Sequence, residues 1–78
     1  MPAYTNRIVS NPDIMLGKPV IKGTRITVEL ILRKLSEGMN MDQLLLAYPQ
    51  LSKEDIYAAL IYASNIIANE EIIFPQAS

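Results

Sequence analysis

Tyr48-Pro49-Gln50-Leu51-Ser52 separates two helical patterns by a short turn, and this turn sets the order of the elements on either side. Pro49 ends the earlier helix, since the residue before a proline is pushed out of the helical region. Ser52 is a good N-cap for the later helix, and Asp55 stands three residues on, in the position of a capping-box acid. Two helices joined in this way have the proportions of a helix-turn-helix.

Outward from this turn, apolar residues at helical spacing and their end signals predict three helices, over about residues 28–37, 41–48 and 52–68. Thr27 and Asn40 are suitable N-caps for the first two helices, and Gln43 completes a capping-box pattern with Asn40. Gly38 is expected to end the first helix as a left-handed residue, with Met39 adding the hydrophobic contact that usually follows.

The third predicted helix is apolar on nearly every side. We expect its core face to consist of Ile56, Ala59, Leu60, Ala63 and Ile67. The other sides still carry apolar or aromatic residues, namely Tyr57, Ile61, Tyr62 and Ile66. Because a three-helix unit can cover only one side of a helix, we expect this helix to pack against another protein chain.

The segments that flank the helices are shorter and less regular. Residues 7–26 predict short β-strands joined by turns, which must pair with each other, lie on the helices or pair with a second chain. The tail, residues 69–78, is apolar at Ile72, Ile73 and Phe74, and either frays or orders on a partner. The expected fold over residues 1–78 is therefore a single, mainly α domain: a three-helix bundle preceded by short N-terminal β-strands.

The composition argues against an enzyme. The chain has no Cys and no His, which excludes disulfides, thiolate ligands and the commonest general base. No activated nucleophile is apparent, and we expect no metal, no cofactor and no small-molecule substrate. The sequence shows neither a secretory signal nor an apolar stretch long enough to span a bilayer, so we expect a soluble, cytoplasmic protein.

The charge is unevenly distributed along the chain. Residues 1–36 carry six basic and two acidic side chains, a balance of +4, whereas residues 37–78 carry one basic and six acidic ones, a balance of −5. The basic half suits a phosphate backbone, although a solvated surface with segregated charges explains it equally well. If DNA is bound, the candidate contacts are Lys18, Lys22, Arg25, Arg33, Lys34, Lys53 and Tyr57.

The helix-turn-helix has two interpretations on residues alone. In a DNA-binding motif the start of the later helix enters the major groove. Here that start carries Glu54 and Asp55 against a single base, Lys53, which is a poor surface to place against phosphates. The motif therefore either reads DNA or serves only as a scaffold.

The run Gly17-Lys18-Pro19-Val20-Ile21-Lys22-Gly23-Thr24-Arg25-Ile26 resembles the opening signature of the prokaryotic family known as domain of unknown function 433. The resemblance begins with Arg7-Ile8 and Pro12-Asp13-Ile14, continues through Ala47-Tyr48-Pro49-Gln50-Leu51 and covers roughly residues 7–68. It implies a homeodomain-like helix-turn-helix fold that tends to dimerise. For some members it also implies a role as antitoxin of a type II pair, encoded beside a PIN-like ribonuclease and binding its own operator.

We therefore expect a non-catalytic homodimer that neutralises a PIN-like ribonuclease and binds operator DNA, with Lys22 and Arg25 holding phosphates. The alternative is a dimeric protein-interaction module without nucleic-acid binding. The residues expected at a dimer or partner interface are Tyr57, Ile61, Tyr62, Ile66, Ile72, Ile73 and Phe74.

Overall fold

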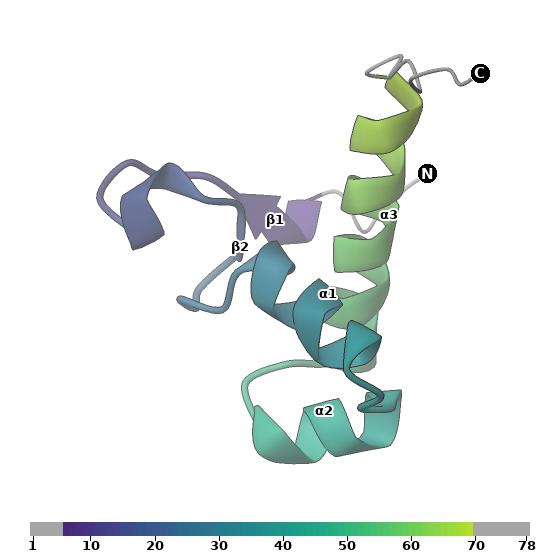
Figure 1. The fold of residues 1–78 in the computed structure, drawn as a ribbon. Coiled ribbons are helices and arrows are strands. Elements are labelled where there is room, and N and C mark those ends of the chain that lie inside the picture. The colour runs from purple at the N-terminus through teal and green to yellow at the C-terminus, as the bar shows by residue number, and fades with distance from the viewer. Residues whose placement is uncertain (1–5, 70–78) are drawn as a thin grey trace, which may run out of the picture.

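The computed structural model describes residues 6–69, which form a mainly helical fold with a small two-stranded sheet (Figure 1). The elements are, in order, β1 (Ile8–Val9), the 3-10 helix η2 (Met15–Gly17), β2 (Val20–Ile21), α1 (Val28–Ser36), α2 (Met41–Ala47) and α3 (Lys53–Asn69). All three predicted helices are present. Each differs from its expected range by a single residue at one or both ends, where caps replace helical geometry.

The two ends of α1 have the predicted caps. The Thr27 side chain accepts a hydrogen bond from the Leu30 backbone N–H at 2.9 Å. Gly38 has a φ of +102°, and the Met39 N–H donates to the Lys34 carbonyl at 3.1 Å across it. These bonds satisfy backbone groups that would otherwise lack partners, so α1 begins and ends where its sequence specifies.

The helices on either side of the turn at Pro49 also begin at predicted caps. Asn40 and Gln43 exchange side-chain-to-backbone bonds of 2.8 Å in each direction, which completes the capping box of α2. Ser52 and Asp55 do the same at α3: the Ser52 N–H donates to Asp55 at 2.9 Å, and the Asp55 N–H donates to the Ser52 hydroxyl at 3.2 Å. Reciprocal caps therefore fix where both helices begin.

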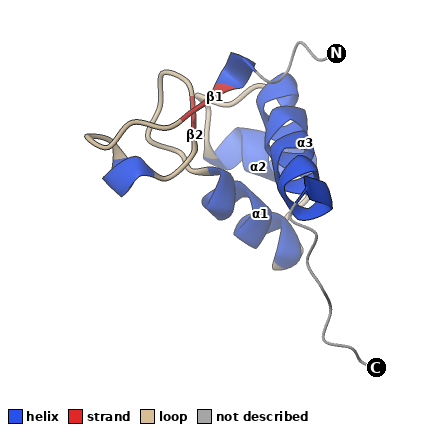
Figure 2. Cartoon of the chain, turned by 90° about the horizontal axis from the view of Figure 1, so that it is seen from above, coloured by secondary structure: helices blue, strands red, loops and turns tan. Residues whose placement is uncertain are grey.

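β1 and β2 pair with each other in an antiparallel register that places Ile8 opposite Ile21 and Val9 opposite Val20. Two of the expected arrangements are therefore present, because the strands pair with each other and also lie on the helices, where β1 contacts α3 and Ile21 joins the core. We call residues 8–21 the arm. The arm extends sideways from the helices, which gather on the other side of the molecule (Figure 2).

The core forms where β2, α1, α2 and α3 meet. Ile31, Leu44 and Ile56, one from each helix, are fully buried, and Ile21 of the arm joins them. Complete burial of a large aliphatic side chain stabilises a fold by roughly 1.5–3 kcal/mol. The remaining buried members of this cluster are Ile26, Val28, Leu51 and Ala59.

The expected core face of α3 is partly wrong. Ile56 and Ala59 are buried as predicted, but Leu60 is 41% exposed and Ile67 is 65% exposed. Asp55 and Ala58 are buried in their place. The covered face is rotated because α1 and β1 contact α3 from that side, and the last turns of α3 continue past the other helices (Figure 1).

Candidate protein-binding groove

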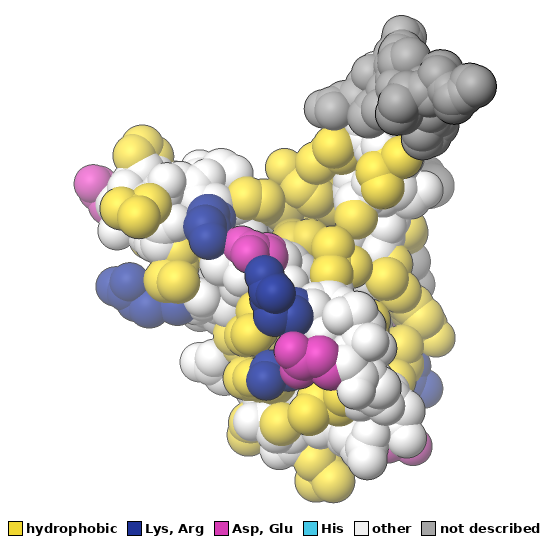
Figure 3. Space-filling view, viewed as in Figure 1, with side chains coloured by type: hydrophobic (Ala, Val, Ile, Leu, Met, Phe, Trp, Pro, Cys, Tyr) yellow, Lys and Arg dark blue, Asp and Glu magenta, His cyan; other side chains and the backbone are white. Residues whose placement is uncertain are grey.

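An open groove of about 510 Å³ lies between α1 and the C-terminal half of α3. Pro19 of the arm contributes a third wall. Hydrophobic side chains gather along α3 where it borders the hollow between itself and the arm (Figure 3). The groove is lined by Pro19, Val28, Glu29, Leu32, Arg33, Ser36, Tyr62, Ala63, Ile66 and Ile67.

The apolar wall that α3 gives to the groove lies in the second half of a helix much longer than α1. α1 has nine residues and α3 has seventeen, so at roughly 1.5 Å per residue α3 is nearly twice as long. The buried stripe of Ile56 and Ala59 continues at helical spacing to Tyr62, Ala63 and Ile66. Beyond Ala59 this stripe becomes progressively more exposed, so an apolar face built like a core lies open.

The expected interface residues fall into three groups. Tyr62 and Ile66 line the groove. Tyr57 and Ile61 do not, because at about 100° per residue they lie on roughly the opposite side of α3 from Ile66. The other three, Ile72, Ile73 and Phe74, lie outside the described residues.

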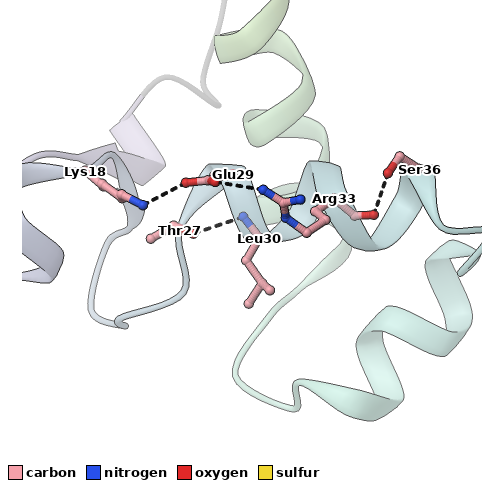
Figure 4. A network of polar contacts seen from close by, with 6 residues as sticks. All are labelled: Lys18, Thr27, Glu29, Leu30, Arg33 and Ser36. Carbon is pink, nitrogen blue, oxygen red and sulfur yellow. Dashed lines mark hydrogen bonds and ion pairs between the residues drawn. The ribbon is translucent and has the colours of Figure 1, made fainter.

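Three charged side chains form a network at the edge of the groove (Figure 4). The Lys18 Nζ donates to Glu29 Oε1 at 2.9 Å, and the Arg33 guanidinium donates to Glu29 Oε2 at 3.0 Å. The hydrogen bond from Lys18, followed by that from Arg33, lowers the pKa of Glu29 below its ordinary value. The network links the arm to α1 beside the groove.

The cations expected to contact DNA fall into two groups, those that form an ion pair within the chain and those that do not. Lys18 and Arg33 share Glu29, and Lys34 lies 3.8 Å from Glu37. Within residues 6–69 the other three expected cations have no ion pair; these are Lys22, Arg25 and Lys53. Cations already paired within the chain are less available to phosphates, so these three are the stronger candidates.

Arg25 lies near the turn of the helix-turn-helix. A second hollow of about 440 Å³ is lined by Thr24 and Arg25 on one side and by Gln50 of the turn on another. Lys53 and Tyr57 are four residues apart at the start of α3, so they share a face of that helix. Glu54 is exposed beside them, whereas Asp55 is nearly buried, so the exposed start of α3 carries one acid and one base.

Arg7 makes a contact that the sequence did not indicate. Its guanidinium lies 3.0 Å from Asp55 Oδ1, and Asp55 is 7% exposed. The two residues are 48 positions apart, so no local pattern could predict the pair. Asp55 therefore caps α3 and also joins it to the start of the described chain.

The described residues do not bring together three or more His, Cys, Asp or Glu side chains in a metal-binding arrangement. Within the same part of the chain, every helix is too short or too polar to cross a lipid bilayer.

The family described as "Protein of unknown function (DUF433)" matches residues 8–63. Among curated proteins, the uncharacterized protein y4eO of Sinorhizobium fredii is 39% identical over 56 residues, which are 72% of this chain and 25% of that protein. Among solved structures, a DUF433 member protein from Anabaena variabilis matches with a TM-score of 0.73 and 33% identity, covering 85% of this chain and 62% of that one. The match thus spans a quarter of the first relative and less than two thirds of the second.

Proposed function

The chain belongs to the DUF433 family of proteins of unknown function, and on that premise we propose that it is a non-catalytic binding protein, the antitoxin of a type II toxin–antitoxin pair. In this role it acts in the cytoplasm as a homodimer and neutralises a PIN-like ribonuclease. The apolar tail residues Ile72, Ile73 and Phe74 contact the ribonuclease.

The observation that carries this proposal is the open groove between α1 and α3. Its walls continue the hydrophobic core, yet Ile66 is 41% exposed and Ile67 is 65% exposed. An apolar face of this kind costs free energy in water unless a partner covers it. A surface built for a protein partner fits a homodimeric binding protein better than it fits an enzyme.

The chemistry of the chain supports a binding role in a second way. Cys and His, the commonest nucleophile-activating and metal-binding side chains, do not occur in the sequence. The charged groups that line the groove, Glu29 and Arg33, are bonded to each other. Both side chains therefore stabilise the fold through this ion pair, which is a structural role and not a catalytic one.

Binding of operator DNA is the second part of the proposal. It depends on Arg25 near the turn of the helix-turn-helix, on Lys22 in the same loop and on Lys53 at the start of α3, because these cations have no ion pair within residues 6–69. The alternative, a dimeric interaction module without nucleic-acid binding, is favoured by the exposed acid Glu54 at the same helix start.

The test measures RNA cleavage by the purified PIN-like ribonuclease encoded in the adjacent reading frame, with and without the full chain. We expect one equivalent of the chain to suppress cleavage, and Phe74→Glu to weaken the suppression while Gln76→Glu does not. An adjacent frame that encodes no nuclease, or cleavage that is unchanged in excess chain, would rule the antitoxin role out.

A further inference from the structure

We propose that the groove is filled by the protruding end of α3 from a second copy of this chain, in a two-fold arrangement in which each copy occupies the groove of the other. This inference rests on the proposed function, because it names the partner of the groove. It assigns self-association to the side of α3 that carries Tyr62 and Ile66, rather than to the opposite side that carries Tyr57 and Ile61.

The charge of the surface favours a copy of the same chain. Residues 56–69 contain no charged side chain, and the charged groups of the groove, Glu29 and Arg33, are already bonded to each other. Over residues 56–69 two such helices can approach without repulsion between like charges, and the acids Glu70 and Glu71 follow this stretch in the sequence. A partner with a charged helix would have to bury that charge, unpaired, against an apolar wall, which is costly.

The shape of the surface favours the same partner. The end of α3 is one wall of the groove and also a ridge, since Ile66 and Ile67 line the groove while they remain exposed. Under a two-fold axis the ridge of each copy enters the groove of the other, and both apolar faces are covered at once. This arrangement closes on itself and leaves no groove open for a third copy.

Packing rules for helices give the position of the second copy. The partner helix would lie against Leu32 of α1 and Ile66 of α3, with Pro19 of the arm as the third wall. It would extend the three-helix unit in the manner of a further helix in a bundle, at the usual interaxial distance of about 8–10 Å. The stripe that begins at Ile56 would then be covered along its described length.

The experiment is sedimentation equilibrium of the full chain and two variants of α3 that gain the same charge. Ile66→Glu places a carboxylate in the groove, and Ser64→Glu places it on an exposed position on the far side of the helix. We expect the unmodified chain to be a dimer, Ile66→Glu to raise the dimer dissociation constant at least about a hundredfold, and Ser64→Glu to leave it nearly unchanged.

A third variant, Ile66→Ala, removes apolar contact without adding charge and is expected to weaken the dimer by about tenfold. Far-ultraviolet circular dichroism checks that each variant keeps its helices. A monomer for the unmodified chain at about 100 μM, or equal effects of Ile66→Glu and Ser64→Glu, would overturn the inference. The RNA-cleavage assay judges the antitoxin role separately, whereas a monomeric chain would also remove the homodimer from the proposed function.

Discussion

Among single residues, Glu29 and Asp55 join segments that are far apart in the sequence. Glu29 accepts hydrogen bonds from Lys18 of the arm and from Arg33 one turn along α1. Asp55 accepts from Arg7 and from the Ser52 N–H, and it is nearly buried. Each carboxylate supports a local helical feature and also a contact between elements.

Stability is expected to depend on pH through Glu29. The bonds from Lys18 and Arg33 lower the pKa of Glu29 in the folded chain, so its contribution is present at neutral pH and is lost as the pH falls through the folded-state pKa. Glu29→Gln should therefore reduce the free energy of unfolding at neutral pH and have little effect at about pH 2. Urea denaturation at both pH values measures this.

The control for Glu29 is Glu37→Gln, because Glu37 is also an exposed acid of the same helical region but lies 3.8 Å from its partner, Lys34. We expect the effect of Glu37→Gln on the free energy of unfolding to differ less between the two pH values than the effect of Glu29→Gln does. A Glu29→Gln chain whose stability falls with acid as steeply as that of the unmodified chain would contradict the role given to the network.

Asp55→Ala should destabilise the fold by about 2 kcal/mol, because it leaves both the Ser52 N–H and the Arg7 guanidinium without their acceptor. Asp55→Asn keeps an acceptor but loses the charge that pairs with Arg7, so it should cost less. Asp42→Ala is the control, since Asp42 is an exposed acid in the first turn of α2 outside that helix's capping box. Urea denaturation followed by circular dichroism compares the three variants.

Among the elements, the arm carries the most unusual backbone. Met15, Leu16 and Gly17 have φ values of +49°, +58° and +84°, so three successive residues are left-handed in η2. Only Gly adopts this conformation without cost, and for other residues the cost is roughly 1–2 kcal/mol. The Leu16 side chain is nevertheless 92% exposed and gains little burial in return.

Leu16→Asn is expected to stabilise the chain by about 1 kcal/mol, because Asn tolerates the left-handed region better than Leu. Leu46→Asn is the matched control: Leu46 is 81% exposed, but it lies within α2, where Asn is a poorer helix former. Thermal and urea denaturation should show opposite shifts for the two variants. A loss of stability in Leu16→Asn would show that the left-handed turn is not strained by its leucine.

At the scale of the whole molecule, ion pairs in the folded chain change which of the charges in the sequence are available to a partner. The basic half of the sequence is partly neutralised, because Lys18 and Arg33 are held by Glu29. The cations without an ion pair in residues 6–69, Lys22, Arg25 and Lys53, lie in the loop before α1 and at the start of α3. Any phosphate contact should concentrate there.

DNA binding can therefore be tested with paired variants in a gel-shift titration against the upstream region of the chain's own gene. Arg25→Gln and Lys22→Gln should each weaken binding and lower the slope of log affinity against log salt by about one. Lys18→Gln should have a smaller effect, since Lys18 is bonded to Glu29. Absence of any shift at low salt would favour the interaction module without nucleic-acid binding.

Local features of this chain could be predicted closely from the sequence. Thr27, Gly38 and the Asn40–Gln43 box each act within one helical turn, and all three are present where expected. The contact between Arg7 and Asp55 and the network around Glu29 could not be predicted, because their partners come from distant segments. Leu60 and Ile67 were wrongly expected in the core for the same reason.

The sequence alone determined the three helices, their caps and an excess of apolar residues on the last helix, because these depend on near neighbours along the chain. Only the tertiary structure decided where that excess lies. α1 packs against α3 and also forms the facing wall of the groove, so the apolar stripe continues into an open groove at Tyr62 and Ile66. Which face of a helix is covered, and over what length, depends on the elements that pack against it in the folded chain.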